Sequence, residues 1–135
     1  MKDIIDMEIV KQIESSGNPK AFNKASCCRG LYQISEVCFK DFRDCHPWQD
    51  WTLDDLYIPE VNTFIARWYM LIRLPAILRS QHIMPTTVNL LAAYNWGPGK
   101  AARWICNQDG DFNSLPEETR DYIAKYFEIE ERDNA

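Results

Sequence analysis

The sequence lacks any apolar run long enough to cross a membrane, and it holds only two histidines. A membrane-spanning helix needs about 20 consecutive apolar residues, whereas Arg73 and Pro75 interrupt the most apolar segment. His46 and His82 stand far apart in the chain, and no cysteines have CxxC spacing. Tetrahedral zinc sites are built from such cysteine and histidine sets. We therefore expect no membrane insertion, no metal and no cofactor.

The sequence has no internal repeat and no surplus of positive charge, and we expect no leader in it. The N-terminal segment MKDIIDMEIVK carries acids where a signal peptide needs an apolar core. Fifteen basic residues against 20 acidic ones give a net charge of −5, which argues against a nucleic acid or an anionic membrane as partner. We expect a monomer that has no secretion signal of its own.

Cysteine occurs five times, so at least one thiol has no partner within the chain. Cys27 and Cys28 are adjacent, and the others are scattered. We expect the thiols to be mostly buried and reduced. A single bridge from Cys27 or Cys28 to Cys106 is the alternative for a protein that works outside the cytoplasm.

The chain has enough apolar material for one domain over residues 1–135. Hydrophobic residues make up 46% of it and aromatic ones 13%, so a single core can form. The aromatic share suits core packing, or a cleft whose flat faces stack on sugar rings. Because no segment alternates apolar and polar residues with period two, we predict an all-α fold with at most a short β excursion in a loop.

Apolar spacing, prolines and glycines predict the individual helices. Proline suits the first position of a helix, where its missing N–H costs nothing, and glycine suits the end. The predicted segments are residues 3–16, residues 31–44, a helical turn at 54–56, a long helix from Pro59 that kinks or ends near Pro75, a helix from Pro85 to Gly97, a helix from Pro98 onward, and a last helix that begins at Pro116 and runs through Tyr126.

The stretch QIESSGNP, residues 12–19, places a charge on the apolar side of the first predicted helix. Met7, Val10 and Ile13 form one stripe at helical spacing, and Glu14 lies on the same side. Gly17 suits a left-handed position that ends the helix. Glu14 then either bends out to water at the helix end, or it is a partly buried acid. In the second case its pKa lies above the ordinary value of about 4.3, because burial disfavours the charged form.

Four stretches together resemble one family of enzymes. They are IESSGNPKAFN (13–23), GLYQI (30–34), AAYNWGPG (92–99) and LPEETRDYI (115–123). In composition, order and spacing they are similar to the motifs of the soluble lytic transglycosylase family. The stretch DLYIPEVNTFIARWYM (55–70) also looks like the long central helix of that family, entered through a Pro-Glu-x-Asn pattern. The resemblance runs from about residue 9 to residue 126.

The resemblance implies a lysozyme-like helical domain of the goose type with a substrate cleft, and it implies cleavage of peptidoglycan. Glu14 would be the catalytic residue, first as acid and then as base. The cleaved bond would be the β-1,4 link between N-acetylmuramic acid and N-acetylglucosamine, and the product a 1,6-anhydro sugar. The resemblance also implies a set of substrate-binding residues: Ser15, Asn23, Tyr32, Gln33, Tyr94, Asn95 and Tyr122.

The sequence also departs from the family pattern, and rival interpretations stay open. Tyr32 stands where the family usually has Met, Trp96 stands where Ala is common, and the loop between Asn23 and Gly30 is about one residue longer. Trp96 is either a stacking platform or a core residue. The rival functions are hydrolysis by a goose-type lysozyme and a non-catalytic murein-binding module. The expected settings are a phage lysin, a phage virion component, or a bacterial protein expressed without its leader.

Overall fold

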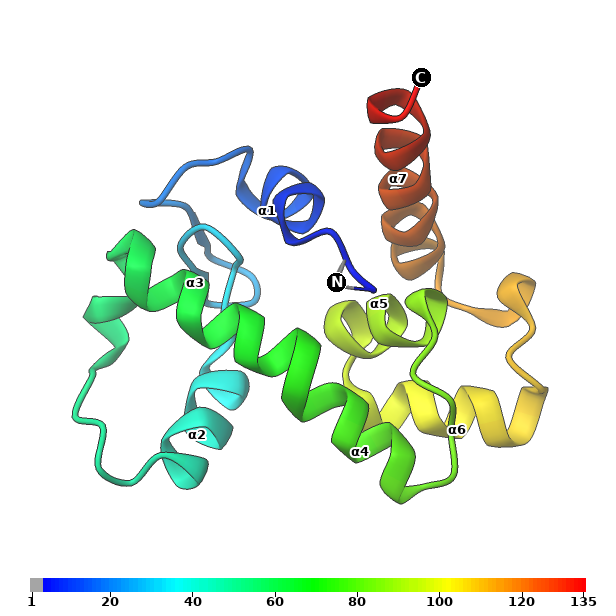
Figure 1. The fold of residues 1–135 in the computed structure, drawn as a ribbon, viewed down its shortest axis with the longest axis horizontal. Helices are drawn as coiled ribbons and strands as arrows, with labels where there is room; N and C mark the ends of the chain where they lie inside the picture. The colour runs from blue at the N-terminus through cyan, green and yellow to red at the C-terminus, as the bar shows by residue number, and fades with distance from the viewer. Residues whose placement is uncertain (1–3) are drawn as a thin grey trace. The chain divides into compact units, whose positions relative to one another are not determined.

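A computed structural model describes residues 4–135, and it is built mainly of helices (Figure 1). The prediction of an all-α fold with a short β excursion in a loop is therefore confirmed. In chain order the elements are α1 (Met7–Ser15), β1 (Phe22–Asn23), β2 (Cys28–Arg29), α2 (Glu36–Cys45), the 3₁₀ helix η1 (Leu53–Tyr57), α3 (Pro59–Trp68), the π helix η2 (Tyr69–Arg73), α4 (Leu74–Ser80), α5 (Thr87–Trp96), α6 (Pro98–Gln108), the 3₁₀ helix η3 (Phe112–Ser114) and α7 (Glu117–Asp133).

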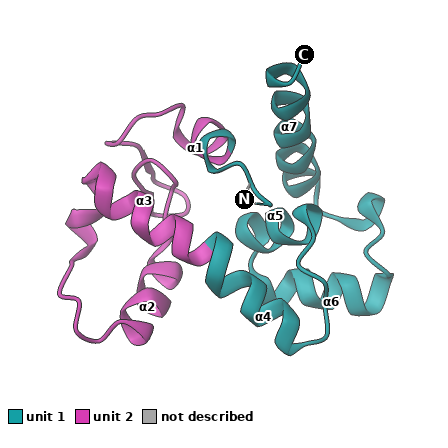
Figure 2. Cartoon of the chain, in the orientation of Figure 1, with its two compact units in different colours: residues 1–9, 70–135 teal, residues 10–69 magenta. Residues whose placement is uncertain are grey.

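The chain divides into two compact units (Figure 2). Unit 2 is one continuous stretch, residues 10–69. Unit 1 combines the N-terminal segment up to residue 9 with residues 70–135. The chain passes from one unit to the other within α1 and again within η2.

In unit 2 the strands β1 and β2 form a hairpin between α1 and α2. It is the only sheet within residues 4–135. Phe22 pairs with Arg29 and Asn23 with Cys28, antiparallel. The predicted helix over residues 31–44 is wrong at its start, because α2 begins only at Glu36. Ser35 ends the preceding turn with its side-chain oxygen accepting from the amide of Cys38, at 3.0 Å. Such an N-cap satisfies a helix donor that would otherwise lack a partner.

The first helix is shorter than the predicted 3–16. Asp3 lies outside the described residues, and α1 begins at Met7 because the Asp6 carboxylate accepts from the amide of Glu8, at 3.0 Å. At the other end Ser16 takes the first left-handed position, with φ of 55°, and Gly17 follows with φ of 81°. The helix therefore ends within a residue of the predicted place, with Ser16 sharing the role that was expected of Gly17.

The helical stretch around residue 70 changes its geometry just before its proline. Pro59 occupies the first turn of α3. The π segment η2 lies directly before α4, in which Pro75 is the second residue. Proline cannot donate to the carbonyl four residues earlier and collides with it, so a widened turn relieves the clash. The helix therefore does not end near Pro75, which was one of the two predicted outcomes; a π segment directly precedes α4, and α4 continues to Ser80.

In unit 1 helix α5 lies at the centre and packs against α4, α6 and α7. It is buried on several sides, with Leu90, Leu91, Ala92 and Ala93 all without exposed surface. Four consecutive apolar residues cover the whole circumference of a helical turn, so the middle of α5 is buried on all sides. The chain then turns at Gly97 into α6, with Pro98 in its first turn as predicted. At the end of α6 the indole N–H of Trp104 donates to the carbonyl of Asp111, at 2.8 Å, and fixes the connection to α7.

All five cysteines are free. Cys38 is buried, Cys27 and Cys28 are partly exposed, and Cys45 and Cys106 are exposed. The prediction that most thiols are buried is therefore wrong, because four of the five lie on turns, short strands or helix ends that reach water.

Candidate active site

Glu14 lies at the second-to-last position of α1 and is partly buried. The apolar stripe that precedes it is buried as predicted: Met7 is 4% exposed and Val10 is 0% exposed, while Ile13 is partly exposed. The helix thus carries its acid at the point where the buried stripe meets solvent. A carboxyl group in that position is reachable by a substrate and at the same time partly withdrawn from water.

The hairpin of unit 2 brings a thiol close to this acid. Burial raises the pKa of Cys28 above its ordinary value of 9.0, a hydrogen bond with Ser26 opposes the change, and the negative charge of Glu14 raises it further. The first motif, at the end of α1, therefore lies near β2, which precedes the second motif. No sequence signal links Cys28 to the site, although the loop that holds it is about one residue longer than in the family pattern.

The second motif, GLYQI, is held by a side chain of α3. Asn62 is fully buried. Its Oδ1 accepts from the amide of Tyr32 at 2.8 Å, and its Nδ2 donates to the carbonyls of Arg29 and Leu56, each at 2.9 Å. Gly30 has φ of 81°, and a Cβ there would collide with the Asn62 amide and the Leu56 carbonyl. Gly30 and Asn62, from two separate motifs, thus form one close-packed contact.

Gln33 joins the first and second motifs. Its Nε2 donates to the carbonyls of Ala21 and Gly30, both at 3.1 Å, while the Gly30 amide donates to the same Ala21 carbonyl at 2.8 Å. Both amide hydrogens of Gln33 are therefore used within the protein. The oxygen Oε1 is the end of this side chain that remains to accept a hydrogen bond from a ligand.

Ser15 and Asn23 both make local hydrogen bonds. The Ser15 hydroxyl donates to the Lys11 carbonyl at 3.3 Å and accepts from the Gly17 amide at 3.2 Å, at the end of α1. The Asn23 Oδ1 accepts from the amides of Ala25 and Ser26, at 2.9 and 3.3 Å, and so shapes the hairpin turn. These contacts position the backbone near the two ends of the first motif, residues 13–23. Both side chains therefore have a structural role.

Unit 1 joins the remaining two motifs in the same way. Asn95 of α5 and Thr119 of α7 form a hydrogen bond in which the Thr119 hydroxyl donates to Asn95 Oδ1, at 2.9 Å. Thr119 is 1% exposed, whereas Asn95 and Tyr94 are partly exposed. Tyr122, one turn beyond Thr119, is buried at 7% exposure. Trp96, the last residue of α5, is partly buried.

The predicted site residues divide between the units. Glu14, Ser15, Asn23, Tyr32 and Gln33 lie in unit 2, whereas Tyr94, Asn95 and Tyr122 lie in unit 1. The sequence interpretation missed Asn62 and Thr119 as residues that support them. Each is a polar side chain at an apolar, helically spaced position, which is the same signal that singled out Glu14. Their long-range partners carry no such signal.

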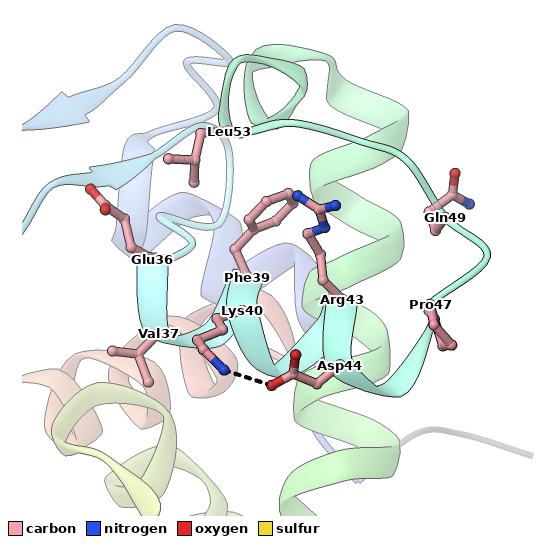
Figure 3. A pocket seen from close by; sticks show the side chains of 9 residues that line it. All are labelled: Glu36, Val37, Phe39, Lys40, Arg43, Asp44, Pro47, Gln49 and Leu53. Carbon is pink, nitrogen blue, oxygen red and sulfur yellow. Dashed lines mark hydrogen bonds and ion pairs between the residues drawn. The ribbon is translucent and has the colours of Figure 1, made fainter.

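A surface pocket of about 750 Å³ lies elsewhere in unit 2, along α2 and the loop that follows it (Figure 3). One wall carries charge: Lys40 donates to Asp44 at 2.8 Å, and Arg43 lies over the ring of Phe39. Leu53 lines the opposite side. None of the predicted site residues lines this pocket, so it is separate from the motifs described above.

Neither a metal site nor a membrane helix emerges from the described chain. Within residues 4–135, no three or more His, Cys, Asp or Glu side chains converge as a ligand set. Over the same residues, no helix combines the length and the apolar character that crossing a bilayer demands.

Comparison with protein families gives a match to the transglycosylase SLT domain over residues 7–114. The match covers most of the chain, so the protein belongs to the transglycosylase SLT domain family, and its helical architecture is that of an all-α, lysozyme-like domain. No curated protein and no solved structure matches the chain. Members of this family are associated with transglycosylase activity on peptidoglycan, which places the action of the domain at the cell wall.

Proposed function

We propose that the protein is a lytic transglycosylase that cleaves the β-1,4 bond between N-acetylmuramic acid and N-acetylglucosamine, with Glu14 as its catalytic residue. The observation that carries the proposal is the family match, which includes α1 and its acid. The partial burial of Glu14 supports it, because a general acid that works near neutral pH must be withdrawn from water to stay protonated.

The reaction needs one acid in two successive roles. Glu14 donates its proton to the glycosidic oxygen, and the bond from that oxygen to C1 of the muramic acid breaks. The ionised carboxylate then takes the proton of the 6-hydroxyl while O6 forms a bond to C1. No water is consumed, and Glu14 ends protonated as it began. Holding nucleophile and electrophile in one molecule gives the second step a high effective molarity.

The substrate-binding residues follow from the resemblance. Gln33, Tyr94 and Asn95 are partly exposed, whereas Tyr32 and Tyr122 are buried, at 2% and 7% exposure. We propose that Tyr32, Gln33, Tyr94, Asn95 and Tyr122 bind the glycan strand, and that Ser15 and Asn23 contribute mainly by shaping the loop. Gln33 offers an acceptor, because both of its N–H groups already donate to main-chain carbonyls. Residues 1–135 are proposed to act as a single catalytic domain and as a monomer, without metal or cofactor.

Replacing Glu14 with Gln tests the assignment directly. The amide has the shape of the acid but cannot donate or take the proton, so wall clearing should fall to about 1% or less of wild type, at least a hundredfold. The matched control is Glu8→Gln, an exposed acid six residues earlier on α1, which should keep full activity. Retention of more than a few per cent of activity by a folded Glu14→Gln protein would remove Glu14 from the mechanism.

Mass spectrometry of the released fragments separates the proposal from its rivals. Lytic transglycosylase products end in 1,6-anhydro-N-acetylmuramic acid and are one water lighter than the products of a lysozyme. Hydrated ends would make the protein a hydrolase. No clearing of purified cell walls in a zymogram, with retained binding to them, would make it a murein-binding module.

A further inference from the structure

The hydrogen bond between Thr119 and Asn95 fixes which end of an amide faces the ligand. Thr119 is buried where α7 packs against α5. A hydroxyl has one hydrogen to give, and here it goes to Asn95 Oδ1 at 2.9 Å. The carbonyl end of the Asn95 side chain is therefore turned toward α7, and its NH₂ group points the other way.

That NH₂ group has no partner within the described residues 4–135. The bond to Thr119 is the side-chain hydrogen bond that Asn95 makes there. Among the described residues, the buried side-chain nitrogen or oxygen that lacks a hydrogen-bond partner is Nε of Arg120. The Asn95 Nδ2 also lacks a partner but does not belong to these buried atoms, so it is open to solvent. Asn95 accordingly presents two N–H donors from the end of α5.

We infer that Thr119 is a positioning residue, which holds the Asn95 amide so that its N–H group binds a carbonyl oxygen of the substrate. The inference rests on the proposed function, since every sugar of a peptidoglycan strand carries an N-acetyl group. The acetamido carbonyl is the strongest neutral acceptor on such a sugar. Without Thr119 the amide could turn, and its oxygen would then face that carbonyl as one acceptor against another.

Thr119→Val is the variant that isolates this role. Valine has the shape of threonine and suits a buried position, but it has no hydroxyl. The unfolding temperature should stay close to that of wild type, because Asn95 is partly exposed and can satisfy its oxygen with water. Thr119→Ser keeps the hydroxyl and is the matched rescue. Asn95→Ala removes the group on which Thr119 is inferred to act.

Binding to chitotetraose, the β-1,4 tetramer of N-acetylglucosamine, is measured by calorimetry against its deacetylated counterpart. We expect Thr119→Val to bind chitotetraose about tenfold more weakly, the effect of one oriented hydrogen bond, and to lose most of the preference for the acetylated form. Thr119→Ser should stay within about twofold of wild type. In the Asn95→Ala background, adding Thr119→Val should change binding by less than about twofold, because the two residues act as one unit.

Three outcomes would overturn the inference. One is a Thr119→Val protein that binds both tetramers as wild type does. Another is a double variant in which the two single effects multiply, because Thr119 would then act independently of Asn95. The third is a wild-type protein without preference for the acetylated tetramer. Wild-type protein that fails to clear cell walls yet shows the expected binding pattern would refute only the proposed function. Normal wall clearing with any of the three outcomes would refute only the role of Thr119.

Discussion

The main-chain amide of Tyr32 donates to Oδ1 of Asn62 at 2.8 Å, across 30 positions of the chain. The same side chain donates to the carbonyls of Arg29 and Leu56. A single buried amide therefore holds the GLYQI loop, η1 and α3 together. Each of its partners would otherwise be a polar main-chain group with reduced access to water.

Replacement of Asn62 by Leu should lower the free energy of unfolding by at least about 3 kcal/mol. Leucine is branched at the same carbon but larger, and it leaves one amide and two carbonyls unpaired, at about 1–3 kcal/mol each. Urea unfolding followed by circular dichroism measures the difference. Asn107→Leu, an exposed position on α6, is the control and should change stability by less than about 0.5 kcal/mol. Equal stabilities of the two variants would show that the Asn62 contacts are dispensable.

Gly30 and Gly17 form a matched pair, because both have φ of 81°. A Cβ at Gly17 meets nothing within 4 Å, whereas at Gly30 it collides with Asn62 and the Leu56 carbonyl. Gly17→Ala should cost about 1–2 kcal/mol for the left-handed backbone alone. Gly30→Ala should cost a further 1–3 kcal/mol or so for the forced shift of packed groups. Thermal unfolding of the two variants compares the costs, and similar values would mean that the Gly30 contact yields without strain.

Tyr122→Phe should reduce wall clearing by roughly ten- to a hundredfold, which corresponds to one or two oriented hydrogen bonds lost from the reaction. The contrasting variant is Tyr126→Phe on the same helix, where the hydroxyl accepts from the Asp6 amide at 2.8 Å. That change should cost about 1 kcal/mol of stability and leave activity at low temperature unchanged. Full activity of Tyr122→Phe would make Tyr122 a core aromatic residue.

Alkaline pH should destabilise the protein through Cys38. Burial, with the negative charges of Asp41 and Cys28, raises the pKa of this thiol far above its ordinary value of 9.0. The unfolded chain therefore releases the proton before the folded protein does. The stabilisation is fully present below pH 9 and is lost as the pH rises toward the folded pKa.

Above pH 9 this loss should amount to about 1 kcal/mol of unfolding free energy per pH unit. Urea unfolding between pH 9 and 10.5 measures the slope for wild type and for Cys38→Ala, which should be less steep. Cys45→Ala, at an exposed thiol, should keep the wild-type slope. A Cys38→Ala protein with an unchanged slope would assign the alkaline loss to other groups.

The helix boundaries show what a single sequence can predict and where it fails. Pro59 and Pro98 opened their helices as expected, because the constraint is local to the residue. The predicted helix over residues 31–44 began too early, because Gly30 and Gln33 adopt positive φ, of 81° and 50°. That conformation depends on hydrogen bonds to Ala21 and Asn62, which lie far away in sequence. Local propensity has no access to such contacts.

The candidate site shows the same difference between local features, which the sequence predicts, and long-range contacts, which it does not. The position of Glu14 on the buried stripe of α1 follows from helical periodicity alone, and the structure confirms its partial burial. The catalytic and binding roles come from the resemblance and stay proposals. Asn62 and Thr119, which hold motif residues in place, were missed as supporting residues. Identifying their partners required the three-dimensional contacts.

The discontinuity of unit 1 constrains the order in which the protein folds during its synthesis. Residues 10–69 form one continuous stretch, so unit 2 has all of its sequence once that stretch has left the ribosome. Unit 1 combines the first nine residues with residues 70–135, and the bond from Asp6 to Tyr126 spans 120 positions. Closing such long-range contacts is slow. The N-terminal segment must therefore wait, without its final partner, until α7 emerges.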